Sequence, residues 1–310
     1  MSVKSNNNGR AFEFALILAI FKTIKKHRQN VILDKQLGFE AAKRAWEASD
    51  LNLQNQLKMA SLSICESLFN LEPLMLDGSD ILELSIQEDK KGESGDVRDI
   101  LIKREKISWI IGLSAKHNHF ALKHSRLSRN LDFGKKWLNI PCSENYFKEI
   151  SPIFDILDST KGQSWNILDK ENTIYKPLLE AFKKELLRIL ETKNICQKLL
   201  SYLVGNYDFY KIIALDSTQE TIIQGFNIYN TLNKALKNPQ FKVKKLEMPT
   251  NVRWFDFKEN SKNTLEINFN NSWAISLRIH NASSKIESSL KFDIKLIGIP
   301  SDLFVIKVKW

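Results

Sequence analysis

The first seventy residues are predicted to be helical from the spacing of their apolar positions. Apolar residues recur every three to four positions over residues 12–24 and again over residues 37–70, where Glu72 and Pro73 end the pattern. The first half of the first helix is apolar on nearly every side, so we expect it to be buried. Residues 1–8 are polar and predict a mobile arm with Asn8 as the N-cap of that helix.

A second pattern, typical of β-structure, begins after Asp80. A strand is expected near residues 81–86, followed by a turn-rich loop at residues 90–95. Two β-branched runs, 97–102 and 107–113, are then separated by a short charged segment and predict a hairpin.

The rest of the chain contains irregular, helical and strand-forming regions. Residues 134–170 are expected to be irregular, and helices are expected at residues 175–204 and 218–237. Apolar and polar residues alternate over the last sixty residues, which predicts a β-rich C-terminal region.

These elements predict an α/β fold with N-terminal helices, a helical middle segment and a β-rich C-terminal region. We divide the chain into residues 1–150, 151–245 and 246–310. The last region either forms a domain of its own or extends the sheet of the first.

The composition is that of a globular protein with a net positive charge. Of 310 residues, 43% are hydrophobic and 26% are charged, which excludes a disordered chain, a collagen or a long coiled coil. The formal net charge is +10, and a charge of this size favours an anionic partner such as nucleic acid.

The cysteines and the early apolar run exclude other classes. Cys65, Cys142 and Cys196 are far apart and form no CxxC pair, so they predict reduced thiols rather than a disulfide framework or a structural zinc site. The run at residues 12–21 is too short to span a bilayer, contains Glu13 and is followed by no cleavage site. The sequence therefore predicts a soluble, cytoplasmic protein with no membrane partner.

Asp96 and Lys116 lie at the two ends of the predicted hairpin, which should bring them together. A carboxylate that holds a divalent cation beside an ammonium group can support phosphodiester hydrolysis. Ser114 lies two residues before Lys116 and therefore shares its face of the strand. Nucleases of the PD-(D/E)xK type carry an acidic residue at that position, so Ser114 is a departure from their pattern.

Three other carboxylates could replace the missing acid. Glu13 is the only charge between Arg10 and Lys22, on a helix that should be buried, although it could instead complement the helix dipole or pair with Arg10. Asp99 is a weaker alternative, because its odd spacing from Asp96 would turn it to the other face of a regular strand. Glu66 is the third choice.

The segment after Lys116 is the most basic part of the chain, with no acidic residue from Lys106 through Leu131. Its residues could bind DNA phosphates and bases or form a solvated basic surface. The candidates are His117, Asn118, His119, Lys123, His124, Arg126 and Arg129. The tripeptide at residues 117–119 is not the nuclease motif whose letters it spells, and no nearby Cys or acid completes a zinc site.

One strand of the C-terminal region offers a second candidate DNA contact. Apolar residues fill one of its faces, while Ser276, Arg278 and His280 line the other and Asn281 follows. This polar face is either an ordinary solvated surface or a surface that contacts DNA.

Several unusual strings occur in a fixed order along the chain. They are Gly9-Arg-Ala-Phe-Glu13, Gly95-Asp-Val-Arg-Asp-Ile100, Ile111-Gly-Leu-Ser-Ala-Lys-His-Asn-His-Phe120, Lys123-His-Ser-Arg-Leu-Ser128, Ser276-Leu-Arg-Ile-His-Asn-Ala-Ser-Ser284 and Ser289-Leu-Lys-Phe-Asp293. Together they resemble the HaeIII-type type II restriction endonucleases, over nearly the whole chain.

This resemblance implies a PD-(D/E)xK-like nuclease core in residues 1–150 and a homodimeric, Mg²⁺-dependent endonuclease. Such an enzyme cuts double-stranded DNA at the palindrome GGCC, leaves blunt ends and is accompanied by a DNA methyltransferase that protects the same sites. The resemblance also implies that Asp96, Lys116 and Glu13 are catalytic. In this hypothesis Mg²⁺ binds Asp96, Glu13 and the backbone carbonyl of Ala115, and Ser114 is compatible with activity.

Two other functions remain open from the sequence. Ser114 suggests a catalytically silent DNA-binding protein on a nuclease scaffold, and the same fold also serves repair nucleases that act on branched or damaged DNA. Cleavage of a plasmid into discrete fragments would separate both from a restriction endonuclease.

Overall fold

The computed structural model describes residues 3–88 and 95–310 and divides the chain into two units. The first unit consists of Met1–Phe120, Tyr207–Leu246 and Asp302–Trp310, and the second of Ala121–Asn206 and Glu247–Ser301. The chain passes from one unit to the other several times, so the units do not coincide with the three consecutive regions expected at 1–150, 151–245 and 246–310.

Four helices begin the first unit, as the apolar spacing predicted. They are α1 (Val3–Ile24), α2 (Leu37–Glu47), α3 (Leu51–Ser63) and α4 (Cys65–Leu71). Helix α1 is buried along most of its length, because its apolar residues surround the helix rather than forming one stripe. The helix already starts at Val3, so the predicted polar arm and the N-cap at Asn8 are wrong for the described residues.

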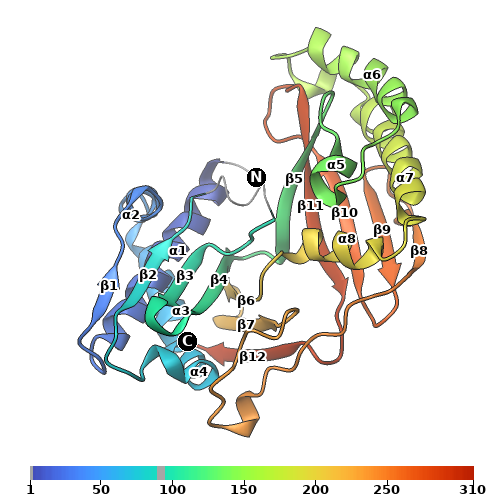
Figure 1. Cartoon of the computed structure of the whole chain (residues 1–310). Coiled ribbons are helices and arrows are strands. Elements are labelled where there is room, and N and C mark those ends of the chain that lie inside the picture. Colours follow the sequence, from blue (N-terminus) through green and yellow to red (C-terminus); the bar gives the residue numbers. More distant parts are fainter. Residues whose placement is uncertain (1–2, 89–94) are drawn as a thin grey trace. The chain divides into compact units, whose positions relative to one another are not determined.

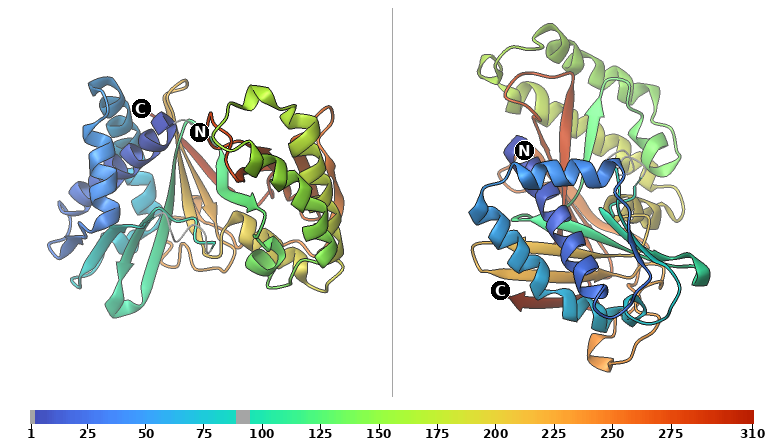
Figure 2. Two further views of the ribbon diagram at one scale, coloured as in Figure 1. Left: turned by 90° about the horizontal axis from the view of Figure 1, so that it is seen from above. Right: turned by 90° about the vertical axis from the view of Figure 1, so that its left-hand side faces the viewer.

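A mixed sheet of seven strands forms the centre of the first unit in the described part of the chain. Its strands, in spatial order, are β1 (Val31–Leu33), β2 (Leu82–Ile86), β3 (Ile100–Arg104), β4 (Trp109–His117), β6 (Phe209–Leu215), β7 (Glu220–Phe226) and β12 (Phe304–Lys309). Strands β2, β3 and β4 are antiparallel, while β6 runs parallel to β4. Helices α1 and α3 lie in front of these strands in the right-hand view of Figure 2 and share their hydrophobic core.

The second unit packs four helices on an antiparallel sheet of five described strands (Figure 1). The strand order is β5 (Ala121–Ser128), β11 (Ser289–Gly298), β10 (Ala274–His280), β9 (Thr264–Phe269) and β8 (Val252–Phe257). The helices are α5 (Phe133–Leu138), α6 (Glu144–Ser159), α7 (Lys176–Leu190) and α8 (Ile195–Val204). Phe292 of β11 contacts Trp137 of α5 and Phe182 of α7, at ring-centroid distances of 6.5 and 5.1 Å, which places the core between sheet and helices.

The coarse fold prediction is confirmed, and two further local predictions are wrong. The structure has mixed α/β architecture, N-terminal helices and a β-rich C-terminal region, with the hairpin β3–β4 and the helices α7 and α8 where the sequence placed them. The helix expected at residues 218–237 is instead the second strand of the hairpin β6–β7, and residues 134–170 contain helices α5 and α6 rather than irregular chain. Most of the turn-rich loop expected at residues 90–95 lies outside the described residues.

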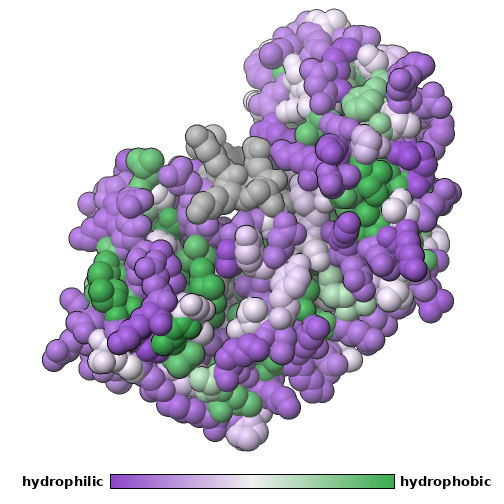
Figure 3. All heavy atoms as spheres, viewed as in Figure 1, coloured by the Kyte–Doolittle hydropathy of each residue, from purple (hydrophilic) through white to green (hydrophobic). Residues whose placement is uncertain are grey.

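The surface and the cysteines agree with the composition. The face shown in Figure 3 is mostly hydrophilic, with small hydrophobic patches. Every helix in the described residues is too short or too polar to cross a lipid bilayer. All three cysteines are free thiols, and burial raises the pKa of Cys65 to about 11.

Candidate active site

The pairing of β3 with β4 brings a carboxylate and an ammonium group together at the start of β3. Ile100 is opposite Leu113, and the backbone N–H of Asp99 donates to the carbonyl of Leu113 at 2.8 Å. Extending this register by one residue places Asp99 opposite Ser114, and opposed residues point to the same face of a sheet. Asp99 therefore shares the face of Ser114 and Lys116.

Three donors converge on one oxygen of the Asp99 carboxylate. Oδ2 accepts hydrogen bonds from the Ser114 hydroxyl at 3.2 Å, the backbone N–H of Ala115 at 2.7 Å and Nζ of Lys116 at 3.0 Å. The side chains of Asp99 and Lys116 keep 24% and 17% of their surface exposed. The pair is thus ordered by its neighbours yet remains accessible to a substrate.

Asp96 lies in a different set of contacts. Its carboxylate accepts two hydrogen bonds of 2.8 Å from Nε and Nη2 of Arg98, and a third of 3.2 Å from the Gln87 side chain. Burial would raise the pKa of Asp96, but the hydrogen bonds and the charge of Arg98 outweigh it and hold the pKa below its usual value. This bidentate ion pair is a stable structural element in its own right.

The expectation that the hairpin would bring Asp96 to Lys116 is therefore corrected by the structure. The carboxylate in contact with Lys116 is that of Asp99, which the strand spacing had predicted to lie on the opposite face. The spacing argument assumed a regular strand from residue 97, whereas β3 begins only at Ile100. Asp96 belongs to the irregular segment before the strand, where the two-residue alternation does not apply.

Arg98 crosses strand β4 above Gly112. Its guanidinium lies 3.9 Å from the ring centroid of Tyr207, a cation–π contact, while its aliphatic part occupies the space where a side chain at position 112 would lie. Arg98 and Asp96 therefore hold the segment that leads into Asp99.

Substituting Gly112 with alanine is expected to destabilise the protein by about 1–3 kcal/mol, because the new methyl group would overlap Cγ and Cδ of Arg98. The Arg98 side chain cannot swing away without losing its bidentate pair with Asp96. Urea unfolding of the variant measures the effect. Gly9→Ala is the matched control, since a Cβ there meets nothing within 4 Å, and equal stability of the two variants would contradict this account.

Glu13 lines a cavity that adjoins this segment. The half-buried Glu13 side chain on α1 shares a cavity of about 240 Å³ with Gly38, Ile86 and Gln87. The backbone N–H of Gln87 donates to the carbonyl of Asp99 at 2.8 Å. Gln87, which lines this cavity with Glu13, is therefore also bound to the backbone of Asp99.

The side chains fit a hard divalent cation better than zinc. In the described part of the chain no three His, Cys, Asp or Glu side chains form a metal-binding group. Mg²⁺ needs only one or two carboxylates, a carbonyl and several waters. Asp99, whose three protein hydrogen bonds all end on Oδ2, would contribute one such carboxylate through Oδ1.

The first residues of the basic segment have partners within the first unit. His117 is buried, and its Nε2 lies 2.8 Å from Oδ2 of Asp216 in the β6–β7 turn. Asn118 donates to the same oxygen at 2.7 Å and accepts from the Asp216 backbone N–H at 2.9 Å. These contacts attach the end of β4 to the neighbouring hairpin, while His119 follows half-buried.

The later residues of the segment belong to β5 and to the turn after it. Arg126 is exposed and donates to the Ser289 hydroxyl at 2.8 Å, whereas Arg129 donates to Ser151 at 3.0 Å and pairs with Asp155 of α6. The side chains of Lys123 and His124 lie outside those that the structure describes.

The second predicted DNA-contacting strand is β10. Arg278 is exposed on it, and Nε2 of His280 lies 3.1 Å from Asp293 of β11. Asn281 exchanges hydrogen bonds with the Tyr175 hydroxyl. The expected alternation of buried and polar positions along this strand is therefore present.

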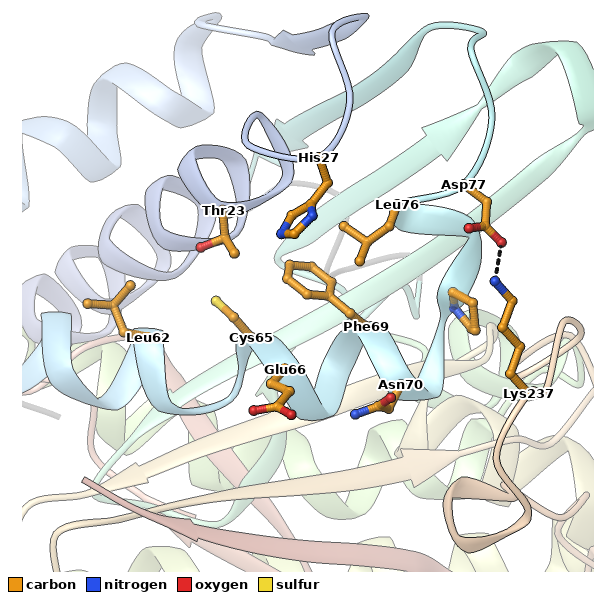
Figure 4. A pocket seen from close by; sticks show the side chains of 11 residues that line it. Thr23, His27, Leu62, Cys65, Glu66, Phe69, Asn70, Leu76, Asp77 and Lys237 are labelled. Carbon is orange, nitrogen blue, oxygen red and sulfur yellow. Dashed lines mark hydrogen bonds and ion pairs between the residues drawn. The ribbon is translucent and has the colours of Figure 1, made fainter.

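Glu66, the third alternative carboxylate, lies elsewhere in the first unit. It is on α4 and lines a cavity of about 550 Å³ together with His27, Cys65 and Lys237 (Figure 4). Neither Asp99 nor Lys116 lines this cavity, so Glu66 is not part of the Asp99 site.

Comparison with known proteins identifies the family. The family model described as HaeIII restriction endonuclease matches residues 9–300. The type II restriction enzyme HaeIII of Haemophilus aegyptius is 45% identical over 318 residues, covering 100% of this chain and 99% of that protein. The chain belongs to the HaeIII restriction endonuclease family. No solved structure gave a significant match.

The HaeIII family membership confirms the resemblance that the sequence motifs indicated, and with it the prediction of a type II restriction endonuclease, a DNA-binding hydrolase. Enzymes of this type generally use a divalent metal ion. Sequence reasoning named Asp99 only as a weaker alternative and did not name its neighbours Arg98 and Gln87. Asp99 directly precedes the apolar run of β3, and this position was a usable signal for its pairing with β4.

Proposed function

We propose that this HaeIII family member cuts double-stranded DNA at the palindrome GGCC, with Mg²⁺ as cofactor and blunt ends as product. We further propose that it acts as a homodimer, since a two-fold symmetric site calls for matching protein symmetry, and that a cognate methyltransferase protects the same sites. The observation that carries the chemistry is the contact of Asp99 with Lys116.

The fold proposal is a PD-(D/E)xK-like core formed by β2, β3, β4 and β6 with α1 against them. Three antiparallel strands followed by a parallel one, with a carboxylate at the start of β3 and Ser114-Ala115-Lys116 in β4, support it. Ser114 replaces the usual acid and donates to Asp99, so the hydroxyl orders the carboxylate instead of binding the cation itself.

Each residue of the site has a chemical task in this proposal. When bound, Mg²⁺ supplies a Lewis acid and lowers the pKa of a coordinated water. Asp99, Glu13 and the Ala115 carbonyl would hold the ion. Lys116 would orient the attacking water and offset negative charge on the phosphoryl oxygens in the transition state. We assign to Asp99 the catalytic and metal-binding roles that the sequence predicted for Asp96. Asp96 instead holds the Arg98 side chain in place.

Digestion of a plasmid of known sequence tests the function directly. Discrete fragments with ends inside every GGCC, formed only when Mg²⁺ is present, are the expected result. Resistance of the same plasmid after treatment with a GGCC-specific methyltransferase would support the proposed restriction pair.

Two other outcomes would replace the proposal. A gel shift without cleavage would favour the catalytically silent DNA-binding protein that Ser114 suggests. Cleavage confined to branched or damaged DNA would favour a repair nuclease.

A further inference from the structure

The second unit has a polar sheet face whose residues come from three neighbouring strands. Apolar residues of β5, β11 and β10 alternate with polar ones, and the apolar set faces the helices. We call the opposite set the open face; it includes Arg126, Ser128, Ser276, Arg278, His280, Ser289, Lys291, Asp293 and Lys295.

Cationic side chains outnumber acidic ones on the open face. Four of these nine side chains are cationic and one is a carboxylate; Arg126 pairs with Glu287, and the face continues to Glu266 of β9, opposite Ser276. Arg126, Arg278 and Lys295 are exposed. Within the described residues, Arg278, Lys291 and Lys295 form no ion pair, whereas Asp293 lies 3.1 Å from His280. Such a surface matches a polyanion.

The strand register places donors and an acceptor next to each other. Arg278 is directly opposite Asp293, Lys291 lies between Arg126 and His280, and Ser276 is opposite Lys295. Strands are about 4.8 Å apart, so the rows from β5 to β10 span about 10 Å, close to the roughly 12 Å width of a DNA major groove. A row of this width can face the edges of one or two base pairs.

We infer that the open face reads the DNA major groove, and that Arg278 and Asp293 together recognise a G·C pair. A guanidinium donates to guanine O6 and N7, and a carboxylate accepts from cytosine N4, so the two neighbouring side chains match the two edges of one base pair. Lys291, Lys295 and Arg126 bind flanking phosphates. This inference rests on the proposed function and extends it to specificity.

The test measures binding with Ca²⁺ in place of Mg²⁺, so that DNA is bound without being cut. Fluorescence anisotropy compares a duplex containing GGCC with a duplex of the same composition in shuffled order, at several salt concentrations. Arg278→Ala is expected to reduce the preference for GGCC by about 10- to 100-fold, and Arg278→Lys does not restore it, because lysine lacks the planar fork.

Lys295→Ala is expected to behave differently. It weakens binding to both duplexes equally and lowers the salt slope by about 1, because a phosphate contact carries no sequence information. The matched control is Lys198→Ala, which removes an exposed lysine of α8, a helix that packs on the other side of the sheet, and leaves both affinities unchanged.

The outcomes separate this inference from the proposed function. If the wild-type protein cuts at GGCC but Arg278→Ala keeps the full preference, the recognition role is refuted while the function stands. If Lys295→Ala and Lys198→Ala bind alike, the open face is not the DNA surface. Failure of the wild-type protein to cut any plasmid would instead refute the proposed function.

Discussion

Replacing Asp99 with alanine is expected to lower the rate of DNA cleavage by about 100- to 1,000-fold. The change removes the carboxylate that Lys116 contacts and that would hold the cation, and the loss of one such transition-state contact typically costs two to three orders of magnitude. Lys116→Ala should have an effect of similar size. Single-turnover cleavage of a GGCC duplex measures both rates.

Binding and the neighbouring aspartate supply the controls. Both variants should still bind the duplex in Ca²⁺ within about tenfold of the wild-type protein, since neither removes a residue of the open face. Asp96→Asn should keep measurable cleavage, because the substitution weakens only the contacts of this side chain with Arg98 and Gln87. Full activity of Asp99→Ala together with an inactive Asp96→Asn would reverse our assignment.

Replacing Glu72 with glutamine is expected to stabilise the protein above pH 7. Glu72 is fully buried at the end of α4, and its Oε1 accepts hydrogen bonds from the Tyr210 hydroxyl at 2.7 Å and the backbone N–H of Asn233 at 2.6 Å. Burial raises the pKa of Glu72 from 4.5 to about 7, although these hydrogen bonds partly oppose the rise.

The sign of the pH dependence follows from proton binding. Between pH 4.5 and 7 the folded protein holds a proton on Glu72 that the unfolded chain has released, so the free energy of unfolding decreases as the pH rises through this range. Above pH 7 both states are ionised and the loss, about 3 kcal/mol, stays constant. Glutamine keeps the acceptor oxygen and does not ionise, so it avoids the loss.

Urea unfolding at pH 5 and pH 8 measures this difference. The wild-type protein should lose most of the 3 kcal/mol between the two pH values, and Glu72→Gln should not. Glu66→Gln, in the first turn of α4 and exposed to solvent, is the control that should follow the wild-type curve. Parallel curves for Glu72→Gln and the wild-type protein would contradict the assigned pKa.

Patterns that reflect how an element is buried were readable from the sequence. Apolar residues surround α1 and alternate with polar ones along β10, and both predictions were confirmed. The hairpin β3–β4 was predicted because a charged turn separates two β-branched runs. By contrast, β6 and β7 are buried on both faces, so their residues do not alternate and the chain there resembled a helix.

The site required information that spacing alone does not contain. The choice between Asp96 and Asp99 depends on where β3 starts, and strand ends are decided by tertiary pairing rather than by local sequence. The partner of His117 is Asp216, almost one hundred residues later, and no local sequence pattern predicts this contact. Family resemblance pointed to this segment of chain, and the hydrogen bonds are the reason that we propose Asp99 within it.

The edge strand β12 makes one border of the sheet depend on residues far along the chain. Residues 304–309 pair with β7 and complete the sheet that carries Asp99 and Lys116. A nascent chain on the ribosome therefore exposes an unpaired β7 edge until residue 309 has emerged. Such an edge is a template for pairing with another chain, so the time before β12 docks is the time when the half-made protein is most prone to aggregate.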